Sequence, residues 1–266
     1  MRLNIAHTST YRYDAPLQFG LQELRMTPKS RAGQTVLRWN FKLEGGEVQC
    51  KFDDQNNNQV MLIALDEGIQ EARIECEGEV ETADNAGVIG RHGGFAPVWF
   101  FNRETPLTAP GPQVRRLAKK IGDASGSDLE KLHALSDTIS DAATYTVGAT
   151  NVTATAEEAL AAGAGVCQDH AHIFISAART LGYPARYVSG YLAMDDRDAQ
   201  DATHGWAEAH VADLGWVAFD VSNGMCPDER YVRVATGLDY KQAAPISGIV
   251  FGATAETLSV EIKVSQ

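Results

Sequence analysis

Three residues in the second half of the chain could carry nucleophilic catalysis: Cys167, His204 and Asp220. Cys167 follows the segment Gly163–Val166 and precedes an apolar run that Gly182 ends, so the pattern predicts that it lies in the first turn of a helix. A helix N-terminus favours the thiolate, which is the nucleophilic form of cysteine. We expect the glycines before it to admit a substrate acyl group and to free backbone N–H groups for an oxyanion.

The histidine and the aspartate belong to two strands that a short turn joins. In the strand 204–211 the even-numbered residues, His204 and Trp206 among them, share one face, while the other face carries glycine, alanine and valine. The next strand, 216–220, ends at Asp220. A histidine base oriented by an acid suits a cysteine nucleophile. Because an even-numbered hairpin loop would point Asp220 away from His204, this interpretation predicts an odd loop or a bulge near 212–216.

The elements around these residues change their period near residue 85. Before it, strands are predicted at 3–13, 37–43, 47–52, 59–65 and 70–83, with a turn at 54–59, which indicates antiparallel β structure of the sandwich type. Cys50 and Cys76 occupy apolar positions of these strands, so we expect both to be buried. After residue 85, helices are predicted near 112–121, near 128–139 and from the capping box at Thr155. The aromatic run 99–101 is expected at the interface between the halves.

Composition and charge narrow the function classes. The 266 residues include 23 Lys and Arg against 35 Asp and Glu, a net charge of −12, which disfavours partners with phosphate backbones or anionic lipid surfaces. The four cysteines stand far apart, and no apolar run suits a signal peptide or a membrane span, so we expect a reducing, cytoplasmic setting. His170 and His172 could in principle form a zinc site with Cys167. On a helix, however, His172 would face away from Cys167, so no metal and no cofactor are predicted.

Two segments carry a resemblance to a known family. GVCQDHAHIFISAARTLGYPARYVSGYL and HGWAEAHVADLGWVAFDVSNG resemble the core of the transglutaminase-like superfamily, and the front half from His7 onward looks like the β domain of its bacterial members. The resemblance implies an α+β fold, in which a papain-like core packs a cysteine-bearing helix on an antiparallel sheet and an all-β sandwich-like domain precedes it. We expect the β domain at 1–90 and the catalytic core at 91–266. Gly205 stands where the family usually has alanine, which is expected to loosen the strand of His204.

The resemblance implies a function and a set of roles. Cys167 would be the nucleophile, His204 the base and Asp220 the residue that orients it, in a cysteine peptidase or amidase that acts on a peptide or protein. Tyr145, Gln168 and Trp206 are predicted to contact substrate, with Tyr145 a candidate oxyanion donor, although Trp206 also suits packing around the site. A cross-linking transglutaminase, a non-catalytic binding module and a metal-dependent hydrolase remain alternatives. No feature of the sequence sets an oligomeric state.

Overall fold

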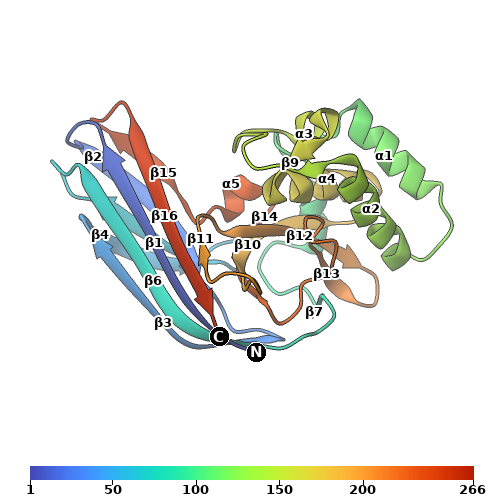
Figure 1. Ribbon diagram of the computed structural model, residues 1–266, viewed down its shortest axis with the longest axis horizontal. Helices are drawn as coiled ribbons and strands as arrows, with labels where there is room; N and C mark the ends of the chain where they lie inside the picture. The colour runs from blue at the N-terminus through green and yellow to red at the C-terminus, as the bar shows by residue number, and fades with distance from the viewer.

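The computed structural model describes residues 1–266 and consists of a β part and an α+β part that lie side by side (Figure 1). The β part is a pair of antiparallel sheets packed face to face. The first sheet has the order β11 (Ala199–Gln200), β16 (Glu256–Ser265), β1 (Arg2–Tyr13), β6 (Glu71–Thr82) and β3 (Gln34–Glu44). The second has the order β15 (Ile246–Phe251), β2 (Phe19–Thr27), β5 (Gln59–Leu65) and β4 (Gly46–Asp53).

Alternation in the sequence explains why these segments form strands with one buried face. In β6 the small and apolar residues from Ala72 to Val80 alternate with Arg73 and three glutamates, and the former set is buried while the charged set faces solvent or stays partly exposed. The predicted strands of the first 85 residues are therefore confirmed. One expectation fails: Cys76 is buried, but Cys50 is exposed, because β4 is the edge strand of the second sheet and most of its residues face solvent.

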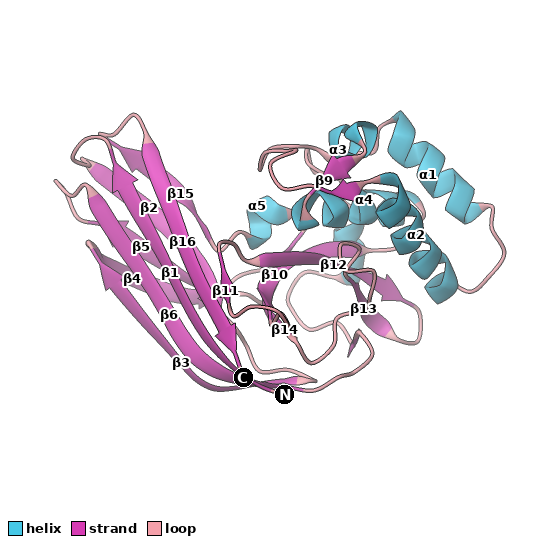
Figure 2. Ribbon diagram, in the orientation of Figure 1, coloured by secondary structure: helices cyan, strands magenta, loops and turns pink.

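The α+β part is built on a third antiparallel sheet with helices on one side (Figure 2). Its strands have the order β14 (Tyr231–Gly237), β10 (Ala185–Leu192), β12 (His204–Val211), β13 (Gly215–Phe219) and β7 (Val88–Gly90). The helices are η1 (Val98–Asn102), α1 (Pro112–Gly122), α2 (Asp128–Ala142), α3 (Ala156–Ala162), α4 (Cys167–Thr180) and α5 (Tyr240–Ala243). A short parallel pair, β8 (Thr144–Tyr145) with β9 (Ala164–Gly165), completes this part. The predicted fold class is confirmed, as are the capping box at Thr155 and the helix that begins after Ser127.

Helix α4 lies at the centre of the α+β part, packed against β12 and surrounded by α1, α2 and α3. It contacts the small face of the strand, where Ala207 and Ala209 are fully buried in the same cluster as Phe174. Small side chains let helix and strand approach closely, so the position of the helix start is fixed relative to the strand that carries His204. This packing is what the alternation of small and large residues in β12 predicts.

The division of the chain differs from the expected ranges 1–90 and 91–266. The C-terminal strands return to the β part: β16 pairs with β1 over ten residues, and β15 pairs with β2. In the other direction, β7 joins the third sheet through β13. The first sheet also serves two cores, since Tyr11 of β1 packs on the second sheet while Leu3 and Ile5 pack with β14. Strand pairing between distant segments depends on partners that a single strand's pattern does not identify.

The aromatic run after β7 divides between core and surface. Phe101 is fully buried against Trp216 of β13, with ring centroids 5.1 Å apart. Trp99, by contrast, is 68% exposed, so the expectation that all three aromatics pack between the halves is wrong for this residue. Polar side chains also join the halves, beside the apolar cluster that Leu3 and Ile5 form with β14. Asn58 exchanges two hydrogen bonds with the backbone of Thr236, and Gln34 makes two with that of Arg233.

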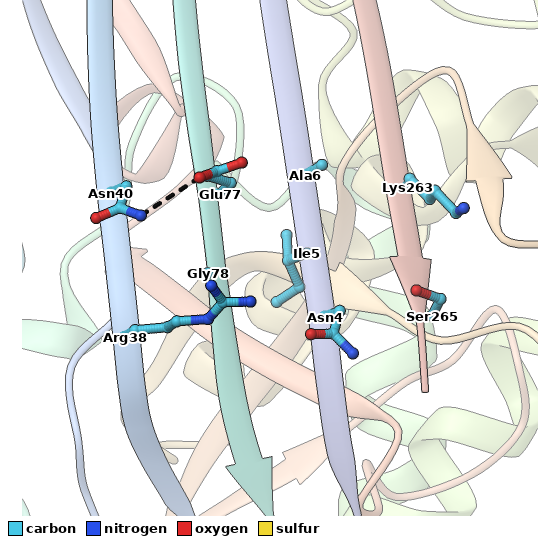
Figure 3. A pocket seen from close by; sticks show the side chains of 9 residues that line it. All are labelled: Asn4, Ile5, Ala6, Arg38, Asn40, Glu77, Gly78, Lys263 and Ser265. Carbon is cyan, nitrogen blue, oxygen red and sulfur yellow. Dashed lines mark hydrogen bonds between the residues drawn. The ribbon is translucent and has the colours of Figure 1, made fainter.

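The outer face of the first sheet is polar. Figure 3 shows Arg38 and Asn40 of β3, Glu77 of β6 and Lys263 of β16 around a shallow hollow, where Asn40 donates a hydrogen bond to Glu77 over 3.3 Å. Gly78 lines the hollow with its backbone, since a Cβ at this position would point inward and come within 2.3 Å of the Trp39 ring. None of the helices has both the length and the apolar character that crossing a membrane requires.

Candidate active site

Cys167 is the first residue of α4, as its sequence context predicts. The residue before it, Val166, is extended, and its backbone N–H donates to the carboxylate of Asp169 over 2.8 Å, which closes the helix start. Gly165 has to lack a side chain because a Cβ there would come within 2.7 Å of Asp169. Gly163 ends α3 in the left-handed region with φ 66°, and its N–H is bonded to that helix. Its N–H is therefore not free for an oxyanion, contrary to expectation.

His204 and Asp220 meet across the hairpin of β12 and β13. The loop between the paired residues Val211 and Gly215 holds three residues, so the predicted odd loop is confirmed. Asp213 and Gly215 adopt positive φ angles of 68° and 80° to make this turn. Even-numbered residues of both strands consequently share one face, and His204 Nε2 lies 2.6 Å from Asp220 Oδ2.

Asp220 is fully buried and holds both of its oxygens in a network of donors. Oδ2 accepts hydrogen bonds from His204, from Asn223 Nδ2 at 2.7 Å and from the Tyr231 hydroxyl at 2.8 Å. Oδ1 accepts from the backbone N–H groups of Ser222 and Asn223. Burial works to raise the pKa of Asp220, yet the hydrogen bonds from His204, Asn223 and Tyr231 hold it below its usual range.

The electrostatics of the site favour a charged imidazole. Burial alone would lower the pKa of His204, but the hydrogen bond to the Asp220 carboxylate and the interaction with the Cys167 sulfur raise it to about 10. Because Nε2 is directed at Asp220, Nδ1 is the ring nitrogen left for Cys167. The side chain of His204 is 10% exposed, so the ring is shielded from water but reaches the surface.

Two aromatic side chains hold the ring of His204 in place. Trp206 stacks on it with centroids 6.1 Å apart and is itself buried, so it packs around the site as one of its two predicted roles requires. Tyr231, at the start of β14, lies 5.9 Å from the ring and also bonds Asp220. Sequence reasoning missed Tyr231 and Asn223. Asn223 stands in the turn directly after the aspartate, which is a usable signal, whereas Tyr231 comes from a strand with no local link to the triad.

The other two residues predicted to contact substrate, Tyr145 and Gln168, lie in different surroundings. Tyr145, on β8 beside the glycine segment, is exposed and lines a cleft of about 610 Å³ together with His204 and Asn223. Gln168 is buried and donates to the carbonyl of Val152 over 3.1 Å, so its amide holds a loop. Of these two residues only Tyr145 lines the cleft at His204.

Gly205 receives a structural explanation. A Cβ at this position would come within 2.0 Å of the Tyr187 hydroxyl, so the glycine makes room for the tyrosine of the neighbouring strand. Burial raises the pKa of Tyr187 well above its usual range, and the charge of Cys167 raises it further. The strand beside the histidine is thus packed against Tyr187 rather than loosened.

The two other histidines of α4 have partners of their own. His170 Nδ1 lies 2.9 Å from the Ser222 hydroxyl, and His172 Nε2 accepts the N–H of Tyr240 over 3.1 Å. No group of three or more His, Cys, Asp or Glu side chains is arranged to hold a metal ion. The chemical groups at the site are the thiol of Cys167, the imidazole of His204 and the carboxylate of Asp220.

Comparison with known proteins identifies the family of this fold. Residues 115–221 match the family model of the transglutaminase-like superfamily, and residues 3–81 match that of the bacterial transglutaminase-like N-terminal region. An uncharacterized protein of Mycobacterium leprae is 28% identical over all of this chain and 99% of its own length. An uncharacterized protein of Mycobacterium tuberculosis is 36% identical over 46% of this chain and 42% of its own.

A solved structure has the same fold. The crystal structure of a protein from Cytophaga hutchinsonii, named as a candidate cysteine protease, aligns with a TM-score of 0.79 at 21% identity. The alignment covers all of this chain and 90% of the other. It therefore includes the β part and its returning C-terminal strands as well as the sheet and helices around Cys167.

Proposed function

Because this chain belongs to the transglutaminase-like superfamily, we propose that it is a cysteine peptidase or amidase that hydrolyses amide bonds through a thioester on Cys167. The observation that carries the proposal is the buried Asp220 carboxylate, 2.6 Å from a His204 ring whose pKa the same carboxylate and Cys167 raise to about 10. A ring held in this way keeps a proton beside the sulfur, which is the arrangement of an activated thiol.

The proposed reaction has two halves. The Cys167 sulfur attacks the carbonyl carbon of the amide, and His204 Nδ1 gives its proton to the leaving amine, so that the C–N bond breaks and a thioester forms. Water then attacks the thioester while His204 takes its proton, and the C–S bond breaks to release the acid and the thiolate. Asp220 remains ionised throughout and holds Nε2–H, which fixes the tautomer and the orientation of the ring.

Two groups are proposed for the oxyanion. The backbone N–H of Cys167 lies in the first turn of α4, where no helical carbonyl can accept from it. The hydroxyl of Tyr145 is the proposed second donor, since this exposed side chain lines the cleft next to His204. Removing one such donor typically costs about 10²–10³ in kcat.

Turnover of a peptide library with mass-spectrometric detection tests the proposal. We expect cleaved products from the wild-type protein, none from Cys167→Ala, and unchanged products from the matched control Cys50→Ala, whose thiol lies on the edge strand β4. Adding a primary amine separates the alternatives: amine adducts in place of acids would identify a transglutaminase. Absence of any product, together with no thioester trapped on Cys167, would identify a non-catalytic module.

A further inference from the structure

A second pocket lies at the seam between the β part and the α+β part and shares no lining residue with the cleft at His204. Its volume is about 320 Å³. The β part contributes the loop 29–32 between β2 and β3 and the turn residues Asn56 and Asn57. The α+β part contributes Arg186 of β10 and Arg233 of β14, and the segment after β7 supplies Arg91.

The lining of this seam pocket is strongly basic although the protein carries a net charge of −12. Five of its eleven residues are cationic and none is acidic: Lys29, Arg31, Arg91, Arg186 and Arg233. Two carboxylates outside the lining, the buried Glu208 and the exposed Asp53, neutralise part of this charge. Glu208 pairs with Arg186 at 2.6 Å and with Arg233 at 2.7 Å, and Asp53 pairs with Lys29 at 2.7 Å. The side chains of Arg31 and Arg91 form no ion pair, so the pocket retains positive charge.

Buried polar atoms in the same pocket lack partners. Asn56 is 4% exposed, and neither its Oδ1 nor its Nδ2 makes a hydrogen bond. The Nε of Arg31 is buried without a partner as well, and burial lowers the pKa of this guanidinium to about 10. Elsewhere along the seam, Asn58 and Gln34 satisfy their amides on backbone groups of β14. Unpaired buried polar groups are costly, so this wall of the pocket is less completely paired than the rest of the seam.

We propose that the seam pocket binds a small polyanion that carries at least two carboxylate or phosphate groups. Guanidinium groups recognise such oxyanions with paired N–H donors, and Arg31 and Arg91 are free to do so. A volume of about 320 Å³ is about ten times the ~30 Å³ of a water molecule, and a single phosphate would leave much of it unfilled.

Thermal shift and calorimetric titration with citrate and with pyrophosphate test the proposal, against sodium chloride at equal ionic strength. Saturable stabilisation by either anion is expected, and the one that binds identifies carboxylate or phosphate chemistry. Arg31→Gln should weaken binding by about 10- to 100-fold, the loss of one charge-assisted paired contact. Arg91→Gln should weaken it less, because Arg91 is exposed at the rim.

The matched control is Arg116→Gln on α1, which removes another exposed cation that does not line the pocket. Binding should be unchanged in this variant. The proposal is overturned if neither anion stabilises the protein beyond chloride, or if Arg91→Gln and Arg116→Gln bind alike. Since Arg91 makes no side-chain hydrogen bond, that comparison does not depend on whether Arg31→Gln folds.

Discussion

Replacing Asp220 by asparagine tests whether the buried carboxylate sets the charge state of His204. Asn223, Tyr231 and His204 all donate to Oδ2, and two backbone N–H groups donate to Oδ1. An asparagine side chain has one oxygen that accepts and one NH₂ group that donates. In either orientation of the amide, its NH₂ group therefore points at groups that themselves donate hydrogen bonds. The substituted side chain has nearly the same size and shape as aspartate, while the His204 ring loses its anionic partner.

The size of the effect follows from the pKa of His204. The rise of this pKa from 6.5 to about 10 corresponds to about 5 kcal/mol of stabilisation of the protonated ring, at ~1.36 kcal/mol per pH unit. The Asp220 carboxylate and the Cys167 sulfur both contribute to this stabilisation. Asp220→Asn should therefore lower the pKa of His204 by about two units. Nε2 would then accept from the asparagine amide, which places the proton on Nδ1 in the neutral ring. Loss of the correct tautomer in serine proteases costs about 10⁴ in kcat, so a loss of ~10³–10⁴ is expected here.

Alkylation by iodoacetamide, followed residue by residue with mass spectrometry between pH 5 and 9, measures the effect without a substrate. Cys50 is exposed and serves as the internal reference thiol in every sample. In the wild-type protein Cys167 should react about 10- to 100-fold faster than Cys50 at pH 6, because only the thiolate is a strong nucleophile. In Asp220→Asn this ratio should fall at least tenfold. Equal ratios in a folded variant, as judged by circular dichroism, would refute the role given to Asp220.

Three further predictions test other parts of the structure. Tyr231→Phe keeps the ring beside His204 but removes one donor to Asp220, so kcat measured on a cleaved peptide should fall about 3- to 10-fold, the effect of a ~1 kcal/mol hydrogen bond, and an unchanged kcat would count against it. Burial lowers the pKa of His7 to about 4 and that of His172 to about 3, so the unfolded state binds their protons first as the pH falls below 6.5. The free energy of unfolding should thus drop by about 2 kcal/mol for each between pH 7 and 5, and urea titrations of His172→Gln should show a smaller drop. Glu208→Gln leaves Arg186 and Arg233 without a buried anion and should destabilise the protein by about 3–5 kcal/mol in the same titrations, whereas a loss below 1 kcal/mol would show that the pair is solvated.

Local patterns predicted those features of the fold and the candidate site that depend on neighbouring residues. The small face of β12 predicted close helix packing, and the position of Cys167 followed from the glycines and the apolar run around it. The requirement that Asp220 face His204 predicted the odd loop, because the number of loop residues in a hairpin decides which side chains of the two strands share a face. Long-range pairing was beyond such patterns: nothing in the residues 256–265 alone identifies β1 as their partner.

The two faces of β12 meet separate requirements, and this explains why one strand could be interpreted so far from its sequence alone. The odd-numbered face has to be small because α4 packs on it, and Gly205 is smallest where Tyr187 comes closest. The even-numbered face carries His204 beside the carboxylate of Asp220 and, four residues later, Glu208 between two arginines of the seam pocket. A shift of this strand by one residue would exchange the faces, burying the polar groups against α4 and removing the base from the thiol and the anion from the arginines. Its register is therefore fixed by packing and by charge at once. The packing and the pairing of His204 with Asp220 are visible in the sequence, whereas the ion pairs of Glu208 require knowledge of β10 and β14.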